Sequence, residues 1–164
     1  MGSYKELKVW NKAIDLVEEI YRLVKMLPQE ERFALSDQMR RAAVSIPSNI
    51  AEGQERGSTK EFKHFIMIAQ GSRAELETQI ELCRRLGYLS SDNIVKAVSL
   101  CDEISRMLRT LVKRLDNSQL ETHNASLRQL PRDLFPGDAL VDHQEHKVID
   151  KVSDLMNSLC ISGI

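Results

Sequence analysis

The chain has 164 residues, of which 42% are hydrophobic, 29% charged and only 5% aromatic, and its net charge is −1. This balance is typical of a soluble globular domain, and it excludes a protein that attracts nucleic acid or anionic membranes through its overall charge. No run of about 18 apolar residues is present and no N-terminal segment resembles a signal peptide, so neither a membrane-spanning helix nor a secreted protein is expected.

The distribution of charge and the cysteine content narrow the class of protein further. Residues 1–120 carry 19 Lys and Arg against 17 Asp and Glu (net +2), whereas residues 121–164 carry 4 against 7 (net −3). Cys83, Cys101 and Cys160 are widely spaced and form no CxxC pair. They therefore indicate neither a disulfide framework nor a zinc site. We expect Cys83 and Cys101 to be buried as small hydrophobic residues in a cytoplasmic protein.

Four segments repeat apolar residues at steps of three and four, the period of an α-helix. The first runs from about Tyr4 to Met26, the second from about Leu35 to Ala51, the third from Ser58 or Thr59 to Gly87, and the fourth from Ser90 or Ser91 to about Leu115. The residues expected to face inward are, on the first helix, Leu7, Trp10, Ile14, Val17, Tyr21 and Val24, and on the second, Leu35, Met39, Ala42, Ala43, Ile46 and Ile50. On the third helix they are Phe62, Phe65, Ile66, Ala69, Leu76, Ile80 and Cys83, and on the fourth, Ile94, Val98, Cys101, Ile104, Leu108, Leu111 and Leu115.

Local signals set the expected helix ends. Ser36 or Asp37 is expected to cap the second helix, and Ser58 with Glu61 has the spacing of a capping box for the third. Pro47 predicts a kink rather than a break, since the apolar row continues beyond it. Gly53 and Gly57 are expected to bracket the loop that follows, and Gly87 to close the third helix.

These patterns predict an all-α protein, an antiparallel up-down-up-down four-helix bundle over residues 4–116. Residues 117–164 are expected to form an irregular C-terminal extension that ends in a short amphipathic helix from Asp142 to about Leu159. One such helix is not stable alone in water, so its apolar face should dock on the bundle, on another subunit or on a partner. Its docking candidates are Val148, Ile149, Val152, Leu155, Met156 and Leu159.

Four longer motifs carry a family resemblance: LKVWNKA (7–13), SDQMRRAA (36–43), SIPSNIAEG (45–53) and IAQGSRAEL (68–76). With them the chain closely resembles the four-helix bundle proteins encoded by intervening sequences in bacterial 23S rRNA genes, a family that includes the accessory variability proteins of diversity-generating retroelements. The resemblance implies an antiparallel bundle, a ring-like homopentamer and no enzymatic activity. It also implies relatives that act with a reverse transcriptase and bind RNA or DNA through basic surface. The weakly basic body and the extension from residue 117 depart from that pattern.

Two basic clusters are candidates for contacts with nucleic acid. One surrounds the connection between the second and third helices and comprises Arg40, Arg41, Arg56, Lys60 and Lys63; the other lies on one face of the fourth helix and comprises Arg106, Arg109 and Lys113. Either set can contact phosphates. The alternative is a solvated face balanced by nearby carboxylates, namely Glu55 and Glu61 for the first set and Asp102 and Glu103 for the second.

Residues 45–53 form an unusual polar motif around Pro47, with Asn49, Glu52 and Arg73 as its candidate residues. In one interpretation Glu52 pairs with Arg73 or with an arginine of another subunit. In the other, small residues on the second helix let the third approach at Gly71 and Ser72, while Ser48 and Asn49 satisfy backbone groups freed by Pro47.

Evidence for an enzyme is slight. His143 and His146 form an HxxH motif that specifies no further ligands, and Glu61 with His64 is the single Glu-x-x-His pair, whereas a di-metal bundle site needs two. We therefore expect no catalytic residues, metal, cofactor or small-molecule substrate. Two hypotheses remain besides a metal enzyme: a homo-oligomeric accessory scaffold that binds a nucleoprotein, and a protein-interaction module that docks through its C-terminal helix. Ala13, Ile20, Ile68 and Ala74 are the expected subunit seam.

Overall fold

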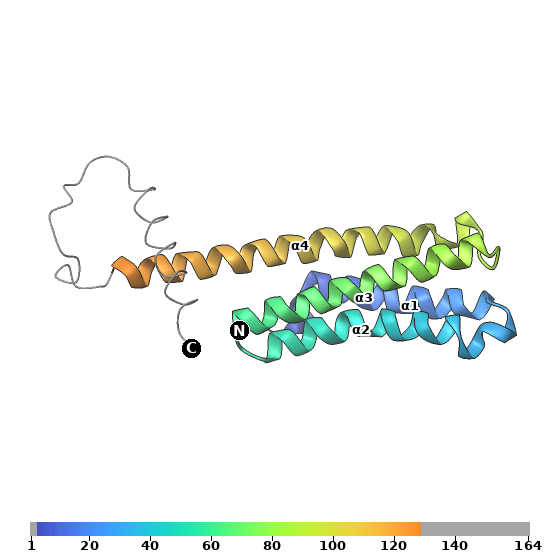
Figure 1. Cartoon of the computed structure of the whole chain (residues 1–164), viewed down its shortest axis with the longest axis horizontal. Helices are drawn as coiled ribbons and strands as arrows, with labels where there is room; N and C mark the ends of the chain where they lie inside the picture. The colour runs from blue at the N-terminus through green and yellow to red at the C-terminus, as the bar shows by residue number, and fades with distance from the viewer. Residues whose placement is uncertain (1–2, 129–164) are drawn as a thin grey trace, which may run out of the picture. The chain divides into compact units, whose positions relative to one another are not determined.

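The computed structural model describes residues 3–128, with side chains as far as residue 117 (Figure 1). The described part of the chain folds into four α-helices, α1 (Lys8–Leu23), α2 (Leu35–Glu55), α3 (Thr59–Arg85) and α4 (Ser91–Arg128). Three short 3₁₀ helices, η1 (Tyr4–Glu6), η2 (Val24–Met26) and η3 (Gln29–Phe33), precede α1 and connect it to α2. The prediction of an all-α four-helix fold is confirmed.

Contacts between helices show the direction of each neighbour. In three pairs of helices, residue numbers rise along one helix as they fall along the other, so the two helices of each pair run in opposite directions. Between α1 and α4 the contacts are Lys12–Glu103 (3.1 Å) and Glu19–Lys96 (3.3 Å). Between α2 and α3 they are Met39–Cys83 (3.6 Å) and Ser45–Ser72 (2.8 Å). Between α3 and α4 they are Lys63–Asp116 and Gln70–Ser105 (3.4 Å).

The core is one continuous cluster, and most predicted inward positions belong to it. The rows of α2 and α3 are correct except for Phe65, which is half-buried outside the core cluster, and Cys83 and Cys101 are fully buried as expected. On α1 the predicted row is rotated: Tyr21 is 44% exposed, and the fully inward row is Val9, Ala13, Leu16, Ile20 and Leu23. Of the predicted row, Leu7, Trp10 and Val17 pack against the edge of the core, and Val24 in η2 is buried as predicted. Two apolar rows with the same period lie side by side on this helix, and the period alone does not say which one faces the other helices.

That rotation removes half of the expected subunit seam. Ala13 and Ile20 have no exposed surface, so their assignment to a contact between subunits was wrong. On α4 a similar error placed Val98 in the core, although it is 38% exposed and Ala97 and Leu100 are buried.

α4 continues beyond its expected end at Leu115 and reaches Arg128, so the irregular segment predicted from residue 117 is wrong at least as far as residue 128 (Figure 1). Asparagines at 117 and 124 lower helix propensity but do not terminate a helix, and the first proline after Leu115 is Pro131. The HxxH motif and all docking candidates of the C-terminal helix lie outside the described residues.

The start of α2 differs from the expected cap. Neither Ser36 nor Asp37 caps it; instead the Leu35 amide donates to the Glu31 carboxylate at 3.3 Å. α2 then runs unbroken through Pro47.

The connection from α2 to α3 was also placed too early. Gly53 is a buried residue inside α2 rather than part of the exit loop, whereas Gly57 lies in the loop with φ +71°. The predicted start and end of α3 are both confirmed. The Ser58 hydroxyl accepts a hydrogen bond from the Glu61 amide at the start, and Gly87 follows the end of the helix with φ +75°.

Candidate nucleic-acid interface

The second half of α4 carries an exposed basic surface. Between Ile104 and Leu115 the helix contains no Asp or Glu and four cationic residues, here called the basic row, which are Arg106, Arg109, Lys113 and Arg114. All four are exposed, whereas Ile104 and Leu108 on the opposite side are buried. The helical period therefore separates the cations from the core and gathers them on the outer face of α4.

The basic row is not neutralised by neighbouring acids. Among residues with described side chains, none forms an ion pair with any of the four cations. The acids predicted to balance the row lie one turn earlier, and one of them, Glu103, already pairs with Lys12 of α1. An uncompensated set of cations on one surface attracts polyanions even when the net charge of the protein is near zero.

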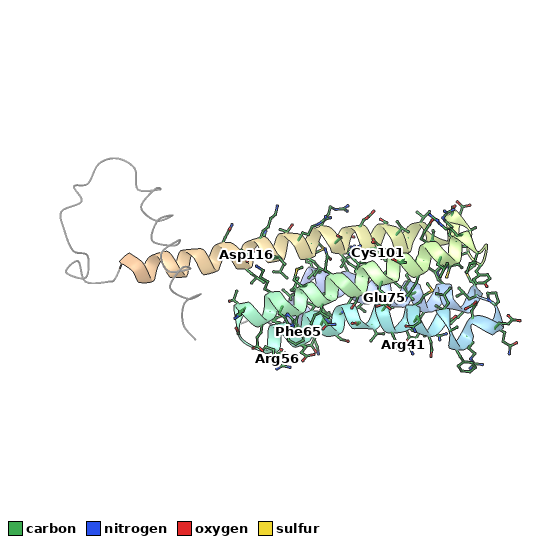
Figure 2. The ribbon with its side chains drawn as sticks, in the orientation of Figure 1. Arg41, Arg56, Phe65, Glu75, Cys101 and Asp116 are labelled. Atoms are coloured by element: carbon green, nitrogen blue, oxygen red, sulfur yellow. The ribbon has the colours of Figure 1, made fainter. Side chains whose placement is uncertain are left out.

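The cluster predicted around the connection between α2 and α3 is different, because carboxylates neutralise most of it. Arg40 and Arg41 share Asp37 at 3.3 and 3.5 Å, and Arg56 pairs with Glu52 at 2.6 Å. The Arg56 guanidinium also lies over the Phe65 ring at 5.3 Å, at the α2–α3 end of the bundle (Figure 2). Lys63 pairs with Asp116 of α4, which leaves Lys60 as the member of the cluster for which the described residues provide no ion pair.

A groove adjoins the basic row where η1 and the start of α1 meet α4. It is lined by Glu6, Leu7, Lys8, Val9, Arg106, Met107, Thr110, Leu111 and Arg114. Sequence reasoning missed Lys8 and Arg114 as members of this surface. Arg114 directly follows Lys113 and was detectable from the helical period, but only the packing of α1 on α4 brings Lys8 to the same place.

The polar motif around Pro47 has a structural explanation. Glu52 pairs with Arg56 on its own helix, and Arg73 pairs with Glu77, so the predicted pairing of Glu52 with Arg73 is not formed. The close approach of α2 and α3 is formed, by the Ser45–Ser72 hydroxyl contact at 2.8 Å.

The side chains beside Pro47 support the backbone next to the proline. Ser48 and Asn49 donate to the carbonyls of Val44 and Ser45 at 2.8 and 2.7 Å. The carbonyl that loses its helical donor to the proline is that of Ala43, so these side chains reinforce the next two positions rather than replace the missing bond.

Metal-binding residues do not gather in the described part of the chain, where no group of three or more His, Cys, Asp or Glu side chains is close enough to hold an ion. His64 is exposed, and its ring contacts that of Phe65 with 5.7 Å between the centroids. Burial raises the pKa of the Cys83 thiol to about 11 and that of Cys101 to about 12, so neither is a ready nucleophile at neutral pH. None of the described helices is long and apolar enough to span a bilayer.

Comparison with known proteins identifies the chain at the level of family. A solved structure from Bacteroides thetaiotaomicron, described as a protein of unknown function from the S23 ribosomal protein family, is 28% identical, with a TM-score of 0.60 over 64% of this chain and 98% of that one. No curated protein matches the chain. The family model described as 23S rRNA-intervening sequence protein matches residues 5–110, which include all of α1, α2 and α3 and the first half of α4. The chain belongs to the 23S rRNA-intervening sequence protein family.

Proposed function

We propose that this protein is a non-enzymatic, homo-oligomeric accessory scaffold that binds a nucleoprotein partner through the basic row of α4. The observation that carries the proposal is that Arg106, Arg109, Lys113 and Arg114 are exposed on the outer side of α4 and form no ion pair with any described side chain. The partner suggested by the family resemblance is a reverse transcriptase with its RNA or DNA.

The small number of cations predicts how this binding depends on salt. Four phosphate contacts give a slope of log affinity against log salt concentration of about −3 to −4, at about 0.7 to 0.9 per contact. We therefore expect binding at low ionic strength that weakens steeply as salt is added.

The test compares two variants with matched changes in charge. In the first, Arg106, Arg109 and Lys113 are all changed to Gln. We expect the plot of log affinity against log salt concentration to become shallower, its slope decreasing in magnitude by about 2 to 3. In the control, Arg40, Arg41 and Arg56, which have carboxylate partners, are changed to Gln, and we expect little change. Retention on immobilised RNA and DNA across a salt series measures both. No retention of the unchanged protein at low salt would contradict nucleic-acid binding.

The homo-oligomeric part of the proposal is supported by the outer face of α3. Apolar and small residues repeat there at helical spacing and remain exposed, namely Met67, Ile68, Gly71, Ala74, Leu82 and the C-cap residue Leu86. Met67 is 56% and Leu82 44% exposed, which is unusual for large apolar side chains along one helix row. A second copy of the chain would cover this face, so the seam that was expected on both α1 and α3 is confined to α3, with Ile68 and Ala74 retained.

Light scattering of the Met67→Glu and Leu82→Glu double variant tests this seam. A carboxylate buried in an apolar interface is costly, so we expect the assembly to dissociate. Lys60→Glu, which also changes one exposed residue of α3 but lies outside the row, should keep the assembly. A monomer for the unchanged protein at micromolar concentration would overturn the proposal of an oligomer.

A second candidate function is a protein-interaction module that does not bind nucleic acid. The α3 face favours it as well, since an exposed apolar row fits a protein partner. Under this alternative the triple Gln variant of the basic row retains its partner, whereas the α3 variant loses it.

A further inference from the structure

The groove beside the basic row has an apolar floor, which charge attraction alone does not require. Leu7, Val9, Met107 and Leu111 line it, and the charged residues of its lining are all exposed. Val9 is buried and the other three are partly buried, so the floor belongs to the packed contact between α1 and α4. A surface that recognised only phosphates would gain nothing from such a floor.

The helical period places the row and the groove side by side. At about 100° per residue, Arg106, Arg109 and Lys113 lie along the outer ridge of α4, and Arg106 is the one nearest the groove. Arg106 and Arg114 both line the groove, with Lys8 from the start of α1. A chain of phosphates along the ridge therefore passes directly beside an apolar recess.

The length of the ridge fits a short stretch of one strand. Arg106 and Lys113 are seven residues apart, about 10 Å along the axis at 1.5 Å per residue. That distance is the axial rise of about three nucleotides, at about 3.4 Å each in one strand. The ridge thus holds few phosphates, and the groove must contribute through contacts of another kind.

The chemistry of the recess distinguishes single strands from duplexes. In a duplex the bases are stacked inside and the outer surface is phosphate and sugar, so an apolar floor has nothing to cover. An unpaired base has two apolar faces and can turn out of its stack to lie against apolar side chains. The carboxylate of Glu6 at the rim disfavours phosphate there and can accept a hydrogen bond from a base amino group.

From this arrangement we infer that the groove receives an unpaired base, so that the ligand of the basic row is single-stranded nucleic acid. The inference rests on the proposed function, because the phosphates of the strand must lie on Arg106, Arg109 and Lys113. It adds the class of nucleic acid and the residues that select it.

The experiment uses the full chain and one RNA sequence as a single strand and as a duplex of equal length. At equal salt, we expect the single strand to bind about tenfold more tightly, because the apolar floor covers one face of the unpaired base. Met107→Gln keeps the length of the side chain but makes the floor polar, so it should weaken single-strand binding about fivefold or more and leave duplex binding unchanged. Val95→Gln, on the same helix and 62% exposed outside the groove, is the matched control and should change neither.

A second measurement does not depend on how well the variant folds. A single strand that contains 2-aminopurine should change its fluorescence when the unchanged protein binds it, because the base leaves its neighbours for the groove. Equal affinity for single strand and duplex, with no fluorescence change, would overturn the inference while the salt dependence still supported the proposed function. Absence of binding to both forms at low salt would overturn the proposed function itself.

Discussion

Gly53 of α2 and Gly71 of α3 meet opposite surroundings although both lie inside helices. A Cβ atom built on Gly53 lies 2.6 Å from the Cβ of Phe65, whereas one built on Gly71 has no neighbour within 4 Å. The sequence suggested the reverse, with Gly71 at a close approach of helices and Gly53 in a loop. Contact between α2 and α3 near their connection thus depends on the missing side chain at residue 53.

Alanine substitutions should therefore have opposite effects at the two glycines. Gly53→Ala is expected to destabilise the fold by about 1–3 kcal/mol, because a methyl group must displace Phe65. Gly71→Ala is expected to stabilise it by about 0.5–1 kcal/mol, because alanine loses less backbone entropy in a helix. Urea unfolding followed by circular dichroism measures both. Because Gly71 lies in the proposed α3 seam, this gain is expected in the dissociated Met67→Glu and Leu82→Glu background, and a loss of stability there would contradict the open surroundings of Gly71.

The burial of the Cys83 and Cys101 thiols supports a second prediction at the scale of residues, which concerns their reactivity. Their raised pKa values of about 11 and about 12 leave them protonated at pH 8, and burial keeps reagents away. In a Cys160→Ser background we expect no thiol to react with a disulfide reagent until denaturant is added, as measured by absorbance of the released thiolate. Rapid reaction of one thiol in native protein would show that the bundle opens locally.

At the scale of the helices, a buried carboxylate joins α1 to α4. The side chain of Glu19 is 2% exposed and accepts hydrogen bonds from Arg22 at 3.2 Å, and it pairs with Lys96 of α4 at 3.3 Å. The hydrogen bond from Arg22 is the main reason that the pKa of Glu19 lies below its ordinary value of 4.5, while burial opposes that shift. The charged form is therefore the one that the folded helices stabilise.

The pKa shift of Glu19 fixes the sign of a pH prediction. Because the pKa is lower in the folded state, the stabilisation is fully present above about pH 4.5 and is lost as the pH falls through the folded-state value. Glu19→Gln should cost about 1.5–3 kcal/mol at pH 7. The difference from the unchanged protein should shrink below pH 4.5.

A neighbouring residue provides the control for this experiment. Glu18→Gln removes an exposed carboxylate on the same helix and should change unfolding free energy by less than about 0.5 kcal/mol. Urea unfolding at pH 7 and pH 3.5 separates the two variants. An equal cost of Glu19→Gln at both pH values would contradict the assigned role of its charge.

At the scale of the whole molecule, the described side chains by themselves form a core that ends before the end of α4. Its buried hydrophobic side chains extend from Val9 to Leu108, and α4 continues to Arg128. We therefore expect a chain that ends at Arg128 to unfold at the same temperature, within a few degrees, as the 164-residue chain. Thermal unfolding followed by circular dichroism tests this. A chain that failed to fold would show that the bundle depends on residues 129–164.

The same truncation separates docking through the C-terminal helix from binding through the basic row. If the protein docks through the predicted helix from Asp142 to Leu159, the shortened chain should lose its partner and keep its fold. If the basic row makes the contact, the shortened chain should bind RNA with an unchanged salt slope. Pull-down of the partner and RNA retention, measured on the same preparations, decide between the two.

The order of apolar residues along the chain was sufficient to predict four helices, most of the core and the ends of α3. These features depend on neighbours within about one helical turn, so the sequence contains them directly. The basic row was predictable for the same reason, because Arg106, Arg109 and Lys113 share one helix face.

Only the tertiary structure decided which of two apolar rows on α1 faces the core, which basic residues are neutralised, and that Lys8 meets Arg106 and Arg114 at one groove. Each of these depends on how one helix is rotated and positioned against another. Helical periodicity restricts that rotation to a few choices, and packing of side chains from distant parts of the chain selects among them.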